Sequence, residues 1–450
     1  MKHNKNTPKN DSRLNRRGFL KSSSAIAGSA AALGSLSIER GAFAQSSDTI
    51  KVALVGCGGR GSGAANQALS TAGDVKLVAM ADAFKDRMDG SLKGLQKNHG
   101  LKADVKDENK FIGFDAYKKA ISMADMVILA TPPGFRPIHF AEAIKQGKNV
   151  FMEKPVAVDG KGVRQVLAAA KEAKKKNLKV GVGLQRHHQL GYQEVIKRIQ
   201  DGAIGDIVSA RSYWNGGGVW VRGRKGYEQA AGRKITEMEY QMRNWYYFVW
   251  LCGDHIAEQH IHNLDVINWV KGTHPASCQG LGGREVRKGI DHGEIFDHHA
   301  VEYKYPDGSY MFSQCRHIRG CWNSVSEHVQ GTKGRATVSG PHTLNGNDGK
   351  QTWRFPGGGK NPYQQEHDDL FDAIRNDKPY NEAFYGAHST LTSVMGRMAT
   401  YSGKMITADE ALNSEENTMP EVLGWEAAPP TLPDEDGRYA IPIPGRTKFA

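Results

Sequence analysis

Residues 50–61 read Ile-Lys-Val-Ala-Leu-Val-Gly-Cys-Gly-Gly-Arg-Gly, and this segment decides the fold of the chain. An apolar strand runs into glycines spaced G-x-G-x-x-G, and the small residues that follow suit a helix. Glycines at these places allow a tight turn and a close approach of the backbone to a pyrophosphate, while the start of the helix offers free N–H groups. The segment therefore predicts a dinucleotide-binding turn. Its expected cofactor contacts are Gly56, Gly58, Gly59, Arg60 and Gly61.

An acidic residue follows the next apolar run at the distance that such a turn requires. Residues 75–81 form a second expected strand that ends at Asp82, which is 21 residues after Gly61. A carboxylate there accepts hydrogen bonds from the ribose hydroxyls and repels a 2′-phosphate, so it favours NAD over NADP. The alternative is that Asp82 is a surface residue in a turn.

Strands and helices go on alternating after this point. Apolar runs at 126–130, 149–152 and 179–183 predict strands, and residues 137–146 and 159–176 predict helices between them. This alternation predicts a doubly wound parallel sheet over residues 48–183, with ligands bound at the carboxyl ends of the strands. Four further cofactor contacts are expected at those ends, namely Thr131, Pro132, Glu153 and Lys154.

The segment Thr131-Pro132-Pro133 and the segment from Gly147 to Pro155, which contains Glu153-Lys154-Pro155, resemble the Gfo/Idh/MocA family (glucose-fructose oxidoreductase and inositol dehydrogenase). The resemblance covers nearly all of residues 48–410. It implies an N-terminal Rossmann domain, a C-terminal α/β domain built on a large open mixed sheet, and a nicotinamide cofactor between them. It also implies oxidation or reduction of a secondary alcohol of a sugar or polyol.

Lys154 is the first candidate catalytic residue, because the lysine of the family motif carries over to this position. The residue type suits the role, since a lysine at the mouth of a nucleotide cleft can bind the reacting oxygen and stabilise or move its proton. Glu153 is expected to fix the lysine side chain. The alternative is that Lys154 is a surface residue after a strand.

The segment 253–265 adds two candidate catalytic residues, Glu258 and His262. Four positions separate them, so on a continuous helix they share one face and can form a carboxylate–imidazole general-base pair. The resemblance matches His262 to the family's histidine and Asp265 to its final aspartate, while Glu258 replaces an aspartate. A metal site built from His255, His260 and His262 is disfavoured, because His260 and His262 lie about 200° apart around a helix. No metal is expected.

Residues 184–410 are expected to form a substrate and oligomerisation domain. Its candidate substrate contacts are Arg186, Trp214 and Asp265. The aromatic, glycine-rich segment 215–250 is either a lid over the substrate or an oligomer contact. Helices near 363–400 could pack back on the first domain, and the Pro-rich segment 411–450 is expected to be an arm on the body or on a neighbouring subunit.

The N-terminus predicts export. Asn15-Arg16-Arg17-Gly18-Phe19-Leu20-Lys21 and the later Ala42-Phe43-Ala44 resemble a twin-arginine signal peptide over residues 1–44, which predicts a periplasmic protein. Those residues carry eight Lys or Arg against two acidic residues, so they hold half of the net charge of +12. The mildly basic remainder predicts neither a nucleic-acid partner nor a membrane anchor after cleavage. Whether Cys315 and Cys321 pair is left open.

Together these features predict an exported oxidoreductase that binds NAD, with NADP less favoured, and acts on a sugar, sugar acid or cyclic polyol. We also expect a homo-oligomer. One alternative is an NAD-dependent glycoside hydrolase, which oxidises a sugar hydroxyl transiently, eliminates the aglycone and returns the hydride. A second alternative is a sugar-binding protein without activity.

Overall fold

Six parallel strands form the first sheet, in the order β3-β2-β1-β4-β5-β6, in a computed structural model that describes residues 49–449. This order confirms the predicted doubly wound sheet. The expected signal peptide at 1–44 lies outside the described residues. The strands are β1 (Ile50–Val55), β2 (Val75–Asp82), β3 (Lys110–Ile112), β4 (Met126–Leu129), β5 (Asn149–Met152) and β6 (Val180–Val182).

Helices cover both faces of this sheet because alternate residues of its strands point to opposite sides. In β4, Val127 and Leu129 join one buried cluster, whereas Met126 and Ile128 join the other. The first cluster contains residues of α3 (Ala116–Ser122), α4 (Arg136–Lys145) and α5 (Gly160–Lys175). The second contains residues of α1 (Gly59–Leu69), α2 (Lys85–His99) and α12 (Pro362–Arg375).

Nine strands form the second sheet, in the order β14-β13-β12-β11-β7-β10-β9-β8-β15. Strand β10 is parallel to β7 and the other neighbours are antiparallel, which confirms the mixed sheet. The strands are β7 (Ile207–Gly216), β8 (Ser277–Gly283), β9 (His298–Lys304), β10 (Tyr310–His317), β11 (Ser324–Gly331), β12 (Gly334–Thr337), β13 (Thr343–Gly346), β14 (Gln351–Arg354) and β15 (Ile406–Thr407).

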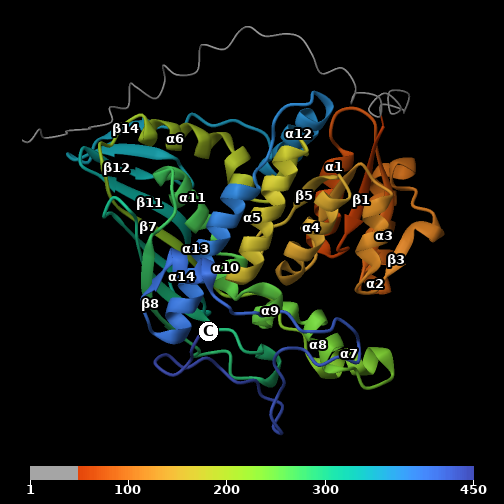
Figure 1. Ribbon diagram of the computed structural model, residues 1–450. Helices are drawn as coiled ribbons and strands as arrows, with labels where there is room; N and C mark the ends of the chain where they lie inside the picture. Colours follow the sequence, from red (N-terminus) through yellow and green to blue (C-terminus); the bar gives the residue numbers. More distant parts are fainter. Residues whose placement is uncertain (1–48, 450) are drawn as a thin grey trace, which may run out of the picture. The chain divides into compact units, whose positions relative to one another are not determined.

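One face of the second sheet is covered and the other is open. Helices α11 (Ile261–Lys271) and α13 (Ala383–Ser402) pack on the covered face, and α13 also packs on α5, so it lies between the two sheets (Figure 1). On the open face, Leu281 is 77% exposed and Phe312 is 45% exposed. Short helices complete this region: α6 (Leu190–Gln200), α10 (His255–Glu258) and α14 (Ala408–Asn413).

The insertion after β7 contains α7 (Arg224–Ala231), α8 (Glu237–Arg243) and α9 (Val249–Cys252). The C-terminal segment 414–449 runs beside it without helix or strand (Figure 1). Gln241 donates to the Thr431 carbonyl at 2.7 Å, and the Tyr439 hydroxyl donates to Glu237. The C-terminal segment therefore lies on the insertion of its own chain.

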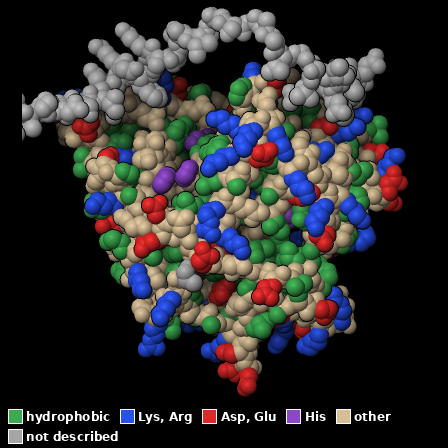
Figure 2. Space-filling model, in the orientation of Figure 1, with side chains coloured by type: hydrophobic (Ala, Val, Ile, Leu, Met, Phe, Trp, Pro, Cys, Tyr) green, Lys and Arg blue, Asp and Glu red, His purple; other side chains and the backbone are tan. Residues whose placement is uncertain are grey.

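Charged side chains are mixed over the face seen in Figure 2, where Lys and Arg alternate with Asp and Glu rather than forming a stripe of one sign. Within residues 49–449, every helix is too short or too polar to cross a membrane. Cys315 and Cys321, whose pairing was left open, both have free thiols.

Candidate active site

A cavity of about 570 Å³ lies where the carboxyl ends of the first sheet face the insertion and the second sheet. A volume of this size suits a bound cofactor with a small substrate. Its lining includes nearly all the cofactor contacts expected from the sequence, from the glycine turn to Asp82, Thr131, Pro132, Glu153 and Lys154. It also includes Trp214, Glu258 and His262.

The glycine turn is shaped to hold a pyrophosphate. A Cβ on Gly56, which has φ +95°, would meet the Ala130 carbonyl carbon at 2.5 Å, and a Cβ on Gly61 would meet the Gly56 oxygen at 1.9 Å. These two glycines therefore serve the turn and the packing of α1. At Gly58 and Gly59 a Cβ would meet no atom of the chain within 4 Å, so the backbone there borders open space in front of the α1 N-terminus. That space fits the phosphates of a dinucleotide.

Asp82 stands at the end of β2, where the cofactor ribose would lie. One carboxylate oxygen accepts from the Cys57 amide at 2.6 Å and the other accepts from the Phe84 amide at 2.8 Å. Burial raises the pKa of Asp82 above its ordinary value, and the two amides offset part of this rise. The carboxylate lines the cleft with acceptor capacity remaining, so the turn and Asp82 together fit NAD.

Lys154 and Glu258 form an ion pair inside the cleft. The Lys154 Nζ lies 3.2 Å from Glu258 Oε1 and also donates to the Glu258 backbone carbonyl. The two side chains are 13% and 16% exposed, so each keeps a small surface toward the cavity. Burial raises the pKa of the Glu258 carboxyl above its ordinary value, and Lys154 offsets only part of that rise. The pair therefore places an ammonium group and a carboxyl group side by side at the edge of the cavity.

His262 lies in the cleft, but the expected pair of His262 with Glu258 is wrong. Helix α10 ends at Glu258 and α11 begins at Ile261, so the two residues do not share the face of one helix. Among the described residues, no hydrogen bond joins them, and His262 instead stacks on Trp214 at 5.9 Å. Burial, and then the charge of Lys154, lowers the pKa of His262 well below its ordinary value. His262 is therefore neutral and can accept or donate a hydrogen bond.

Glu153 does not fix Lys154 as the sequence analysis expected. It pairs with the Arg60 guanidinium, which also lies 3.1 Å from Glu366 on α12 and 4.9 Å from the Tyr363 ring. Burial and the charge of Glu153 raise the pKa of Glu366 well above its ordinary value. Arg60 thus joins the glycine turn to β5 and α12, and Lys154 depends on Glu258 alone for its ion pair in the described structure.

Two of the expected substrate contacts lie outside the cleft. Arg186 is buried in an ion pair with Glu327, and its guanidinium lies 5.5 Å from the Tyr192 ring. Asp265 is buried between His187 at 2.9 Å and Ser389 at 2.8 Å. Both residues hold the second domain together, and only Trp214 of the three lines the cavity.

Sequence reasoning missed several residues of the cleft. Arg136 is buried at its floor and donates to the carbonyls of Leu129, Thr131 and Glu153, so it fixes the ends of β4 and β5. The insertion contributes Trp220, Arg222, Met242, Arg243 and Trp245. Only the aromatic and basic composition of 215–250 indicated their role. Gln259 and Tyr363 also line the cavity, and no local pattern marked them.

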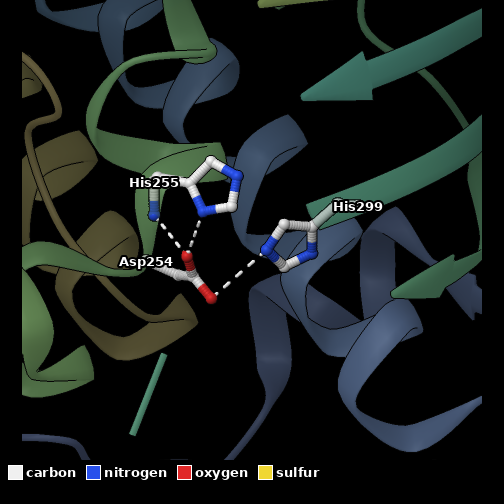
Figure 3. A group of neighbouring side chains, drawn as sticks. All are labelled: Asp254, His255 and His299. Carbon is white, nitrogen blue, oxygen red and sulfur yellow. Dashed lines mark hydrogen bonds and ion pairs between the residues drawn. The ribbon is translucent and has the colours of Figure 1, made fainter. Parts of the chain in front are cut away.

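A buried group beside the cleft has the residue types of a metal site. Figure 3 shows His255 and His299 turned toward opposite oxygens of Asp254, at 2.7 Å and 3.2 Å. The carboxylate also accepts from the Tyr401 hydroxyl at 2.6 Å and the Phe296 amide at 3.0 Å. Burial favours the neutral form, but His299 and His255 hold the pKa of Asp254 well below its ordinary value. With its oxygens already occupied by donors, Asp254 fits a structural anion better than a metal ligand.

Comparisons with known proteins agree with this geometry. Residues 50–183 match the GFO_IDH_MocA family, an oxidoreductase family with an NAD-binding Rossmann fold. Over 232 residues the chain is 27% identical to 2,7-anhydro-N-acetylneuraminate hydratase of Escherichia coli (strain K12), covering 48% of this chain and 55% of that protein. Over 247 residues it is 27% identical to inositol 2-dehydrogenase of Ralstonia nicotianae, covering 54% of this chain and 61% of that protein.

The chain thus spans between half and two thirds of the length of these relatives. In three dimensions the likeness extends further. The crystal structure of aldose-aldose oxidoreductase from Caulobacter crescentus superimposes with a TM-score of 0.62 at 16% identity, covering 80% of this chain and 99% of that one. Both domains therefore share their fold with that enzyme, and the first domain is of the NAD-binding type.

Proposed function

We infer, from a Rossmann domain over residues 50–183 that matches the Gfo/Idh/MocA oxidoreductase family, that this protein transfers hydride between NAD and a secondary hydroxyl group of a sugar, sugar acid or cyclic polyol. The observation that carries the proposal is the Lys154–Glu258 ion pair, which lies in the same cavity as the glycine turn and Asp82. A dinucleotide on the turn and a small polyol beside Lys154 fit one cleft.

The residues of the chain then bind the alcohol and move its proton. Bound NAD supplies the acceptor for the hydride of the carbinol carbon. The Lys154 ammonium gives one proton to the Glu258 carboxylate, because burial favours the neutral form of that carboxyl group. The Lys154 amine that results then takes the proton of the substrate hydroxyl. The positive charge restored on Lys154 stabilises the oxygen as it becomes a carbonyl. Neutral His262 and Trp214 hold the substrate face of the cleft.

The test begins with the purified protein and no added nucleotide. Denaturation should release NAD, and a panel of sugars, sugar acids and inositols should include members that reduce it, as seen by nicotinamide absorbance. A protein that holds NAD while no member of the panel reduces it would contradict the proposal.

A second candidate is an enzyme that returns the hydride to the same sugar after an elimination. The observation in its favour is the similarity to two proteins named 2,7-anhydro-N-acetylneuraminate hydratase. An NAD-dependent glycoside hydrolase follows the same logic. Release of aglycone, or addition of water to an anhydro sugar, without accumulated reduced nicotinamide would favour this class. Sugar binding without chemistry leaves the Lys154–Glu258 pair without a role.

We also propose that residues 1–44 direct export through the twin-arginine pathway to the periplasm. The support is the pair Arg16-Arg17 followed by Ala42-Phe43-Ala44. Replacing both arginines by lysine should leave the full-length precursor in the cytoplasm, whereas the unaltered chain is recovered from the periplasm in its shortened form. Equal export of the two chains would contradict this assignment.

A homo-oligomer through the open face of the second sheet is proposed on the exposed apolar residues there. Leu281 and Phe312 project from that face, Phe312 stacks on Tyr310 at 6.4 Å, and Trp322 packs on Tyr213 at 5.5 Å. A two-fold pair of such faces would remove them from water. Phe312→Asp with Leu281→Asp should reduce the mass in solution to that of the monomer. An unchanged mass would contradict this interface.

A further inference from the structure

A short chain of hydrogen bonds ends on Gln259, which directly follows Glu258 at the cleft. The Arg287 Nη2 lies 2.6 Å from His317 Nδ1, and His317 Nε2 lies 2.8 Å from Gln259 Oε1. Arg287 is 4% exposed and His317 is 5% exposed, so both are removed from water. Gln259 is half-buried and lines the cavity.

The chemistry of arginine decides which group donates and which accepts in both of these hydrogen bonds. A guanidinium only donates, so His317 Nδ1 must accept and carries no proton. The neutral ring then has its proton on Nε2, which donates to Gln259, and the atom that accepts is the amide oxygen. Burial, and then neighbouring positive groups that include Arg287, lowers the pKa of His317 far below its ordinary value, in agreement with a neutral ring.

The surroundings of His317 hold the ring in this orientation. The His255 ring packs against it with ring centroids 4.4 Å apart and a tilt of 30°. Asp254 in turn binds His255 Nδ1 at 2.7 Å (Figure 3). Arg287 is held by a second hydrogen bond to the Phe296 carbonyl and lies 5.2 Å from the Tyr247 ring. The cluster of Asp254, His255 and His299 therefore supports the His317 ring, which orients Gln259.

With its oxygen bound to His317, Gln259 presents its NH₂ group away from the cluster. Within residues 49–449 this NH₂ has no protein acceptor, and Gln259 borders the cavity that contains Lys154 and His262. We propose that the Gln259 amide is a substrate-binding donor, which holds an acceptor oxygen of the sugar or polyol next to the reacting hydroxyl. This inference rests on the proposed function, because that function supplies the polyol.

Two substitutions of Gln259 test the donor directly. Gln259→Leu removes the donor, and Gln259→Glu keeps an acceptor for His317 but has no amide proton to donate. Each variant should lower kcat/KM about ten- to a hundredfold on the substrate found in the panel. NAD content and Tm should stay unchanged. Gln96→Glu, on the exposed side of α2, is the matched control and should keep the activity of the parent.

Deoxy analogues identify the oxygen. One deoxy analogue should lose activity with the parent protein and lose no more when Gln259 is also changed to Leu, because both changes remove the same hydrogen bond. Losses that simply multiply for every analogue would overturn the proposal. So would a Gln259→Leu protein with the parent's kcat/KM.

A separate measurement tests whether Arg287 and His317 position the Gln259 amide. Arg287→Met frees His317 to change tautomer, so the Gln259 amide can turn its oxygen toward the cleft. We expect KM for the full substrate to rise with little change in kcat. The deoxy analogue identified above should then have nearly the same kcat/KM as the full substrate. If no polyol reduces NAD, calorimetry can measure the binding of the same polyols and deoxy analogues to the parent protein and to the Gln259 variants. A failed function and a failed donor are thereby distinguished.

Discussion

Lys154 is the residue on which the proposed chemistry depends. Its motif marked it in the sequence, but its partner was not visible there, since Glu258 lies 104 positions later in the chain. Removing the ammonium also leaves a buried carboxylate without its cation. Glu258 would then take a proton, since burial already raises its pKa.

Lys154→Ala should therefore lower turnover about a hundredfold or more, because the group that binds the oxygen and moves its proton is gone. NAD content should stay unchanged, since the glycine turn and Asp82 are intact. The measurement is single-turnover reduction of bound nicotinamide. Lys161→Ala, exposed on α5, is the control, and turnover close to that of the parent in the Lys154 variant would remove the assignment.

We expect Asp82 to control the choice between NAD and NADP. Asp82→Asn keeps oxygen and nitrogen atoms near the Cys57 and Phe84 amides but loses the negative charge that repels a 2′-phosphate. The ratio of the Kd for NADP to the Kd for NAD should fall about tenfold or more, as measured by titration of the cofactor-free protein. A ratio equal to that of the parent would show that another group excludes NADP.

At the scale of elements, the interruption between α10 and α11 explains where sequence reasoning failed. Local spacing predicted one helix over 253–265, yet Asp254, at φ +71°, caps only a single turn, α10, which ends at Glu258 before α11 begins at Ile261. Its carboxylate is held by Tyr401 and Phe296, which are distant in sequence. Contacts of this kind leave no local pattern. By contrast, β1 and β4 are short apolar runs between turns, and the sequence predicted both these strands and the doubly wound parallel sheet that contains them.

His188 joins β6 to the helices that pack back on the first domain. It lies 2.6 Å from Asp369 of α12 and 3.0 Å from Glu382, which precedes α13. Burial alone would lower the pKa of His188, but hydrogen bonds to these carboxylates raise it to about 10. The stabilisation is complete below the ordinary value of about 6.5 and is lost as pH rises through the raised value.

Unfolding experiments at several pH values should therefore show a specific loss of stability. Between about pH 6.5 and pH 10 the free energy of unfolding should fall by on the order of 2–4 kcal/mol. His188→Gln should be less stable at neutral pH and should lack most of this slope. His328→Gln, on the second sheet, serves as control, and an unaltered slope in the His188 variant would contradict the ion-pair account.

The insertion closes the cofactor end of the cleft through Arg243 of α8. Its guanidinium lies 4.1 Å from the Phe84 ring and 3.4 Å from Asp86, so it reaches across to the turn after β2. Trp425 of the C-terminal segment packs on the same ring at 5.1 Å. The sequence analysis expected this segment to be a lid over the substrate or an oligomer contact, whereas Arg243 reaches the residues that follow β2.

Arg243→Ala should speed the dissociation of NAD about tenfold, because the contact across the cleft is removed. Dialysis with quantification of retained nucleotide measures this. Arg233→Ala is a matched control, because both Arg243 and Arg233 pair with Glu239, but the Arg233 side chain is 58% exposed. Equal retention of NAD in both variants would show that the insertion does not hold the cofactor.

At the scale of the whole molecule, the two sheets and the insertion line one cleft, and the C-terminal segment packs on the insertion from outside its lining. The doubly wound sheet, the mixed sheet and the NAD-binding turn were all predicted from local sequence and resemblance. The misassigned Arg186 and Asp265 show the limit, because a buried ion pair and a substrate contact use the same residue types. Only the fold decides which of them faces the cleft.

Transfer of deuterium is the measurement that tests the central claim most directly. The holoprotein, as purified, is mixed with a polyol deuterated at the reacting carbon, and the released nucleotide is analysed by mass spectrometry. The account predicts reduced nicotinamide that carries the deuterium, at no more than one equivalent per site without a second acceptor, and almost none with Lys154→Ala. Consumption of the polyol with no deuterium on the nucleotide would contradict it.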